Sequence, residues 1–395
     1  MAKVAGLYYE PVGRPCRLNI SFCYCVLLLL VTFFEFVRVF FIYESSDGFN
    51  TKMLKVLMHA FFMQMMLGNV IFLFRVTPRI RNYFKDYDMY RAHADVVNND
   101  ERVQRGVRHK VLVFWFLSGP LKLIFTLLTV IYPSTAYNYL RPYYQGPPEN
   151  ISYAAASIFA ICRLFHSFND ITNVVFLLSM CHLLNEEFDL TTSQLEKYSR
   201  EEHVEDEGAQ TFNSIRQHYL RLCKLATTLD GAVGPFVLAA CLTDLLGVTF
   251  HILPLMLNKP IIPGHETLSI MVVVASGLDR CFHLGGVVYA GVSLTSKTRK
   301  IQPLLMRLDV SAMCRSSYQV AQLFLLKVAY DHVGLTAWGL LNINKPFVVT
   351  VVSLGLTYSV ILGRFGLTFG DKTPTQELFT QVVNYTTASY TVLSD

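Results

Sequence analysis

The sequence predicts an all-α membrane protein, a single domain over residues 1–395 with seven transmembrane helices, a cytoplasmic amino terminus and an extracellular carboxyl terminus. Its composition supports this class, since 52% of the 395 residues are hydrophobic, 16% are charged and the mean hydropathy is +0.37. A typical soluble domain carries more charge and a smaller apolar fraction. Two further observations agree: seven apolar stretches have the length of a membrane span, and lysine and arginine gather in alternate connections.

Seven stretches are long enough to cross the hydrocarbon core of a bilayer, which is about 30 Å thick and needs roughly 20 apolar residues in a helix. They are residues 19–43, 53–74, 111–132, 152–184, 231–257, 268–294 and 346–369. The first stretch follows Lys3, Arg14 and Arg17, as the apolar part of a signal peptide would. It is too long for that part and lacks a cleavage site of small residues. We therefore predict that it is retained as the first membrane helix.

The orientation follows from the basic residues, because short connections rich in lysine and arginine stay in the cytoplasm. Two predicted inner segments hold most of these residues: Arg75, Arg79, Arg81, Lys85, Arg102, Arg105, Arg108 and Lys110 in one, and Lys297, Arg299, Lys300 and Arg307 in the other. The opposite connections hold few: Lys52, Lys55, Arg141, Lys259 and Lys372. The tail 370–395 is therefore predicted to be extracellular. Two glycosylation sequons, at Asn150 and Asn384, fall on the same outer side.

Three segments on the predicted cytoplasmic side are expected to be helical. Segment 75–110 mixes charges of both signs, which indicates a solvated helical hairpin. Segments 185–230 and 295–345 repeat apolar residues at helical spacing. These are Phe212, Ile215, Tyr219, Leu222 and Leu225 in one and Val320, Leu323, Phe324 and Val328 in the other. After them, Pro346 is expected to begin the last membrane helix, where its missing N–H costs little.

Ionisable residues recur inside the predicted membrane helices, where an unpaired charge costs several kcal/mol and marks a candidate functional site. The candidates are Lys122, Arg163, His166, Asp170, Asp244, Asp279, Arg280 and His283. One interpretation is that they line a single water-filled pocket, open to the outside, that binds a polar ligand. The alternative is that they pair as structural ion pairs, Asp244 with Arg280 and Arg163 with Asp170.

The last predicted helix carries a motif. Thr357 and Tyr358 are followed by five mostly apolar residues, Arg364 and Phe365. This order resembles the TYhhhhhQF signature in the last helix of invertebrate gustatory receptors, in which h is a hydrophobic residue. The run from Leu335 to Pro346 is similar to the family's approach to that helix. One position departs from the signature, because Arg364 stands where the family has Gln.

The resemblance implies a chemosensory receptor of the plasma membrane that acts as a ligand-gated, non-selective cation channel. It implies that a small-molecule agonist binds in the outer half of each subunit's helix bundle. Segments 185–230 and 295–345 would form a cytoplasmic anchor that holds four subunits together, as a homotetramer or with related subunits. The stripe that faces the shared ion pore would be Thr357, Tyr358, Ile361, Arg364 and Phe365. Asp371, two helical turns after Arg364, would provide a counter-charge.

Other functional classes find less support in the sequence. It contains no phosphate-binding loop, nucleophile motif or metal-ligand spacing, so we expect no enzyme activity, no cofactor, no metal and no nucleic-acid partner. A seven-helix G-protein-coupled receptor and a secondary transporter remain as alternatives. The first would have reversed termini. Its Asp/Glu-Arg-Tyr element is matched only by Asp279-Arg280-Cys281, which lies inside the predicted sixth helix.

Overall fold

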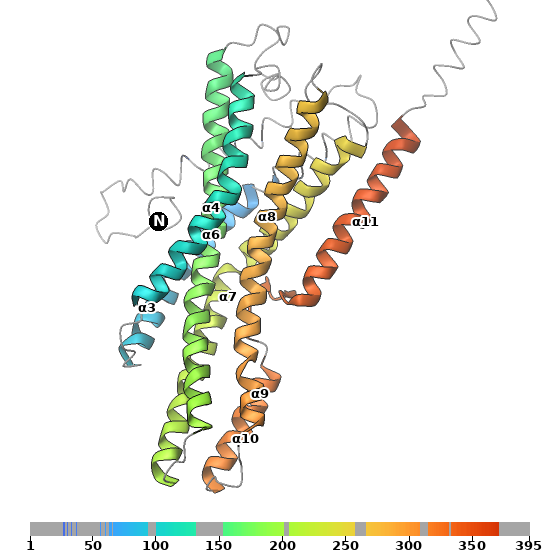
Figure 1. Ribbon diagram of the computed structural model, residues 1–395. Coiled ribbons are helices and arrows are strands. Elements are labelled where there is room, and N and C mark those ends of the chain that lie inside the picture. The colour runs from blue at the N-terminus through green and yellow to red at the C-terminus, as the bar shows by residue number, and fades with distance from the viewer. Residues whose placement is uncertain are drawn as a thin grey trace, which may run out of the picture.

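The computed structural model describes residues 66–93, 100–131, 153–200, 205–256, 266–308, 315–331 and 333–370, and eight single positions before them (27, 30, 33, 37, 56, 60, 63 and 64). This part of the chain is almost entirely helical (Figure 1). The helices are η1 (Phe72–Val76, a π-helix), α3 (Thr77–His93), α4 (Asp100–Ile131), α6 (Tyr153–Tyr198), α7 (Glu205–Met256), α8 (Glu266–Arg299), α9 (Ile301–Met306), α10 (Arg315–Tyr330) and α11 (Lys345–Gly370). Two short strands, β1 (Thr336–Ala337) and β2 (Leu341–Asn342), pair antiparallel before α11.

Two of the predicted membrane helices, 152–184 and 231–257, are parts of much longer helices. Helix α7 has 52 residues and α6 has 46. At 1.5 Å per residue, α7 extends over about 78 Å, more than twice the thickness of a bilayer core. Figure 1 shows α6, α7 and α8 running side by side along the length of the molecule. Residues 185–198 and 205–230 are thus helical as predicted, in continuation of the spans on either side of them.

The end of the bundle that holds the α6–α7 connection has a core rich in aromatic side chains. Phe188, Phe212 and Phe324 are among the most deeply buried side chains of the described chain. Phe324 of α10 lies edge-on to Tyr219, with ring centroids 5.3 Å apart, and contacts Phe212 in the same way at 6.2 Å. Of the apolar residues whose spacing predicted these helices, Phe212, Phe324 and Val328 are buried within the chain, whereas Leu323 is exposed.

Helix α3 is less exposed than expected for a solvated hairpin. Its face formed by Ile80, Tyr83 and Tyr90 is buried in the bundle. The hydroxyls of Tyr87 and Tyr90 donate hydrogen bonds to the two carboxylate oxygens of Glu187 on α6, at 3.2 and 3.4 Å. Burial and the neighbouring Glu187 carboxylate raise the pKa of Tyr90 well above its ordinary value, so the phenol remains a donor. The predicted solvation of this segment does not hold for the buried face of α3, because the prediction weighed the charges and overlooked this tyrosine stripe. Residues 94–99, between α3 and α4, lie outside the described part.

The chain enters α11 through a tight hairpin that the sequence did not predict. Trp338 and Gly339 at its tip have positive φ angles, 56° and 72°, and the strands on either side are two residues long. Pro346 lies in the first turn of α11, as predicted. The side-chain oxygen of Asn344 accepts the backbone N–H of Phe347 at 3.0 Å, which satisfies a donor that the new helix leaves free.

Among the described residues, one helical stretch, Gly208–Thr249, combines the length and the apolarity needed to cross a membrane. Lys345–Ile361 in α11 is apolar but shorter. The predicted helix 19–43 and the first part of 53–74 lie outside the described residues, apart from the single positions given above. Asn150, Asn384 and Asp371 also lie outside them, so their predicted roles stay predictions.

Candidate functional site

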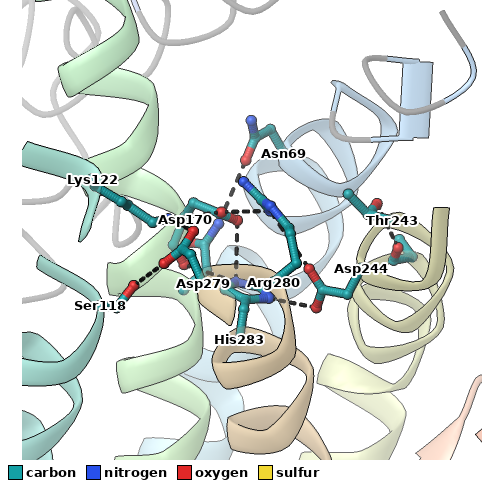
Figure 2. A network of polar contacts seen from close by, with 11 residues as sticks. Asn69, Ser118, Lys122, Asp170, Thr243, Asp244, Asp279, Arg280 and His283 are labelled. Carbon is teal, nitrogen blue, oxygen red and sulfur yellow. Dashed lines mark hydrogen bonds and ion pairs between the residues drawn. The ribbon is translucent and has the colours of Figure 1, made fainter. Parts of the chain in front are cut away.

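Six of the eight predicted intramembrane candidates come together in one polar cluster (Figure 2). Four long helices supply most of its side chains, and Asn69 comes from helical residues 66–71. Ser118 and Lys122 come from α4, Asp170 and Asn173 from α6, Thr243 and Asp244 from α7, and Asp279, Arg280 and His283 from α8. Most of these side chains are buried. The cluster therefore joins helices that are far apart in the chain.

Asp170 lies at the centre of the cluster and contacts three basic side chains. Its Oδ2 atom is 3.1 Å from Lys122 Nζ and 2.9 Å from Arg280 Nη1, and its Oδ1 atom is 3.1 Å from His283 Nε2. A carboxylate with three cationic donors is stabilised as an anion. Asp170 thereby ties α4 and α8 to α6.

Asp244 is completely buried on α7 and pairs with two groups of α8. Its Oδ2 atom is 2.5 Å from His283 Nδ1, and its Oδ1 atom is 3.5 Å from Arg280 Nη1. Both ring nitrogens of His283 thus face carboxylate oxygens, those of Asp244 and Asp170. Each nitrogen needs a proton to make its hydrogen bond, so the geometry favours the imidazolium form.

Asp279 completes the balance of charges. Its Oδ2 atom is 3.6 Å from Lys122 Nζ, and Ser118 donates a hydrogen bond to its Oδ1 atom. With His283 protonated, Lys122 and Arg280 bring the positive charges to three, matching the carboxylates of Asp170, Asp244 and Asp279. A neutral, mutually paired cluster avoids the large cost of an isolated charge in an apolar interior.

A small cavity borders the cluster. It is lined by Gly68, Asn69, Asp170, Asn173, Phe236, Ala240, Thr243 and His283. The volume of this cavity is about 20 Å³, which is enough for one water molecule. Asn173 donates to Asn69 Oδ1 at 3.5 Å, while its own Oδ1 atom is buried without a hydrogen-bond donor in the described chain. In this conformation the cavity is smaller than a typical small-molecule site of at least about 300 Å³.

The structure bears on the two interpretations of the intramembrane charges. The pair between Asp244 and Arg280 is present, and Asp170 is also paired, with Lys122, Arg280 and His283. Arg163 and His166 lie on α6, but their side chains are outside the described part of the structure. A predicted contact between Arg163 and Asp170 therefore stays a prediction.

Sequence reasoning missed the neutral polar members of the site. Ser118, Asn69, Asn173 and Thr243 all contribute, and each stands in an apolar stretch. Asn173 follows Asp170 by one helical turn and Thr243 directly precedes Asp244, so their spacing carried a usable signal. Among the described residues, no group of three or more His, Cys, Asp and Glu side chains has the arrangement of a metal site.

The predicted pore stripe lies on one side of α11, which Figure 1 shows at the edge of the bundle. Thr357, Tyr358, Ile361 and Arg364 are exposed in the single chain, whereas Ser359 and Gly363 are buried. The side chain of Phe365 is outside the described part. Gly355 lets α11 approach α7, because a Cβ atom at that position would lie 3.1 Å from Leu245 Cδ1. These four side chains are thus not buried within the described part of the single chain.

Comparison with known proteins gave a family and a fold. A family model described as 7tm chemosensory receptor matches residues 3–369. The structure of the insect olfactory receptor OR5 from Machilis hrabei in complex with eugenol is similar, with a TM-score of 0.68 and 11% identity, over 92% of this chain and 95% of that one. The structure of the same receptor described without eugenol gives a TM-score of 0.62 and 13% identity, over 91% and 94%. No curated protein sequence matches the chain.

Proposed function

Because this chain belongs to the 7tm chemosensory receptor family, a family of membrane proteins, we propose that it is a ligand-gated channel opened by a small molecule. The agonist binds within the helix bundle of each subunit, at the cavity beside the polar cluster. The pore is non-selective for cations and forms at the centre of an assembly of four copies, or of copies with related subunits. The protein acts in the plasma membrane.

The observation that carries the ligand site is the cavity beside the charge cluster. Buried charged networks are costly to build, and a core of apolar side chains would hold the same helices together at lower cost. The network here borders a cavity lined by Asn173, whose Oδ1 atom is buried without a hydrogen-bond donor in the described chain. A ligand that donates hydrogen bonds is favoured there, since it satisfies this oxygen. The cavity widens when the ligand binds, because its present size suits one water molecule.

The exposed stripe of α11 supports the pore. Around a four-fold axis, Arg364 would place four guanidinium groups at one level. At ~6 Å, each would repel a monovalent cation by about 0.7 kcal/mol in water and about 3 kcal/mol at an effective dielectric constant of 20. A barrier of that kind, summed over four subunits, opposes cation flow. We therefore propose that Asp371 or an acidic group of a neighbouring subunit neutralises Arg364.

The test is patch-clamp recording from the purified protein in liposomes during a screen of small molecules. A channel gives agonist-dependent currents in the absence of any G protein. A G-protein-coupled receptor gives none under these conditions, and a transporter gives saturable flux without unitary current steps. Absence of current with every compound, from protein that is correctly assembled, would argue against the channel.

A further inference from the structure

Two interrupted helices meet beside the cavity. The first interruption is the π-helix η1, which connects helical residues 66–71 to α3. Thr77 donates both its backbone N–H and its hydroxyl to the carbonyl of Phe72, the hydroxyl at 3.1 Å. Pro78 follows, and in a regular α-helix its ring would clash with the carbonyl of Phe74. The wider turn of η1 avoids this clash, and such turns often mark functional sites.

The second interruption is in the backbone hydrogen bonding of α7, at Pro235, although the helix itself continues. Proline has no backbone N–H, so the carbonyl of Gly231, four residues earlier, lacks its helical donor. Arg79 of α3 provides one instead, with Nη1 2.8 Å from Gly231 O. Each interruption therefore depends on the neighbouring helix for its geometry or its hydrogen bonding. We call this contact region, residues 72–79 with residues 230–236, the joint.

The joint is in direct contact with the cavity. Phe236 lines the cavity and lies edge-on to Phe72 of η1, with ring centroids 5.0 Å apart and an angle of 84° between the rings. Gly68 and Asn69, which also line the cavity, precede Phe72 by about one turn of the same helix. A molecule that enlarges the cavity therefore presses on both sides of the joint.

The joint also holds the hairpin that leads into α11. Asp230 accepts the backbone N–H of Thr336 at 2.6 Å and the Thr336 hydroxyl at 2.8 Å. Trp338 donates its backbone N–H to Gly234 O at 3.1 Å. Gly234 permits this approach, since a Cβ atom there would lie 3.3 Å from Thr336 O. The guanidinium of Arg75 in η1 lies over the indole ring of Trp338, 5.7 Å from its centroid.

We infer that the joint transmits occupancy of the cavity to α11, with Arg75 and Arg79 as the positioning residues. This inference rests on the proposed function. Arg75 and Arg79 are four residues apart, so rotation or repacking of η1 moves both. Such a movement displaces Trp338, because Arg75 lies over its ring. It also displaces α7, because Arg79 donates a hydrogen bond to Gly231 of that helix. Lys345, the first residue of α11, follows Trp338 by seven positions. The movement is therefore passed to the start of the proposed pore helix through the short segment between these two residues.

The experiment compares four variants in single-channel and dose-response recordings: Arg75→Gln, Trp338→Leu, the double variant, and Arg81→Gln as the control. Arg81 lies on α3, the helix that follows η1 directly, and has no polar contact with α7 or residues 333–344 in the described chain. The half-maximal agonist concentration should change by about 2- to 30-fold for each single variant, the range that a cation–π contact supports. The double variant should show no more than the larger single effect, because both changes remove the same contact. Unitary conductance should match that of the control.

A second arm removes Leu73, one residue of η1, and replaces Pro78 with Ala. Because a π-turn contains one residue more than an α-turn, the deletion allows regular α-helix once the clash of the proline ring is gone, and it keeps Asn69 and Arg75 on their own faces. We expect assembled channels with lower maximal open probability and unaltered conductance. If wild-type channels respond to agonist and all these variants respond as Arg81→Gln does, the inference is overturned and the proposed function stands. If wild-type protein gives no agonist-dependent current, the proposed function itself fails.

Discussion

Replacing Asp244 with Asn tests whether the polar cluster is a balanced ionic unit. Asp244 is fully buried and contacts both His283 and Arg280. The substitution keeps the size of the side chain but leaves the cluster with one positive charge in excess. Breaking a buried ion pair costs about 3 to 5 kcal/mol. For a chain of 395 residues, an unfolding entropy of ~2.1 cal/mol/K per residue converts this to a decrease of roughly 4 to 6 °C in the apparent melting temperature.

The assay is thermal unfolding of the detergent-solubilised protein, followed by loss of the assembled peak in size-exclusion chromatography. Asp88→Asn serves as the control, since Asp88 is exposed on α3 and surface changes usually stay within about 0.5 kcal/mol. A second change, His283→Gln, removes the excess charge at the contact itself. We expect it to restore more than half of the lost stability of Asp244→Asn.

A third combination separates local pairing from net charge. Lys122→Gln restores neutrality as well, but Lys122 contacts Asp170 and Asp279 rather than Asp244. Rescue by His283→Gln should therefore exceed rescue by Lys122→Gln. Equal rescue would mean that net charge alone matters. A melting temperature for Asp244→Asn equal to that of the control would refute the reasoning that the pair is buried and strongly coupled.

Three further predictions concern activity and topology. Neutralising Asp170 or Arg280 should shift the half-maximal agonist concentration more than the maximal current of assembled channels; unchanged dose-response curves for both would leave these residues a structural role only. Arg364→Gln should preserve or raise the cation current and Asp371→Asn should suppress it, as bi-ionic reversal potentials and unitary currents will show; an unaltered conductance in Asp371→Asn would indicate that Arg364 is turned from the pore. An epitope tag placed after Asp395 should be labelled on intact cells, and labelling only after permeabilisation would contradict the predicted topology.

The sequence predicted those features that depend on neighbours along the chain. Apolar stretches located α6, α7, α8 and α11, and the apolar spacing that includes Phe212 and Phe324 predicted further helices, because one helical face must be buried whatever it packs against. Pro346 marked the start of α11 for a similarly local reason. The motif that begins at Thr357 indicated the family from a few neighbouring residues.

The site depended on contacts between distant parts of the chain. Asp244 and Arg280 were weighed as a pair, but the place of Lys122 and His283 around Asp170 was not foreseen, because the sequence sets the depth of a helix only to within about a turn. The partners Ser118 and Asp279 are 161 positions apart, and no local pattern carries such a pairing.

The joint shows the same limit. Pro78 and Pro235 are each visible in the sequence as a helix interruption. Arg79 donates a hydrogen bond to the Gly231 carbonyl, which Pro235 leaves without a helical donor, and Trp338 donates its backbone N–H to Gly234 nearby. These contacts follow only from the way α3 and residues 333–344 pack against α7. The sequence by itself determined which segments are helical and which charges need partners, because backbone preference and the cost of burying charge act on each segment separately. The tertiary structure alone decided which partner each group found, because that depends on the rotation and offset of whole helices.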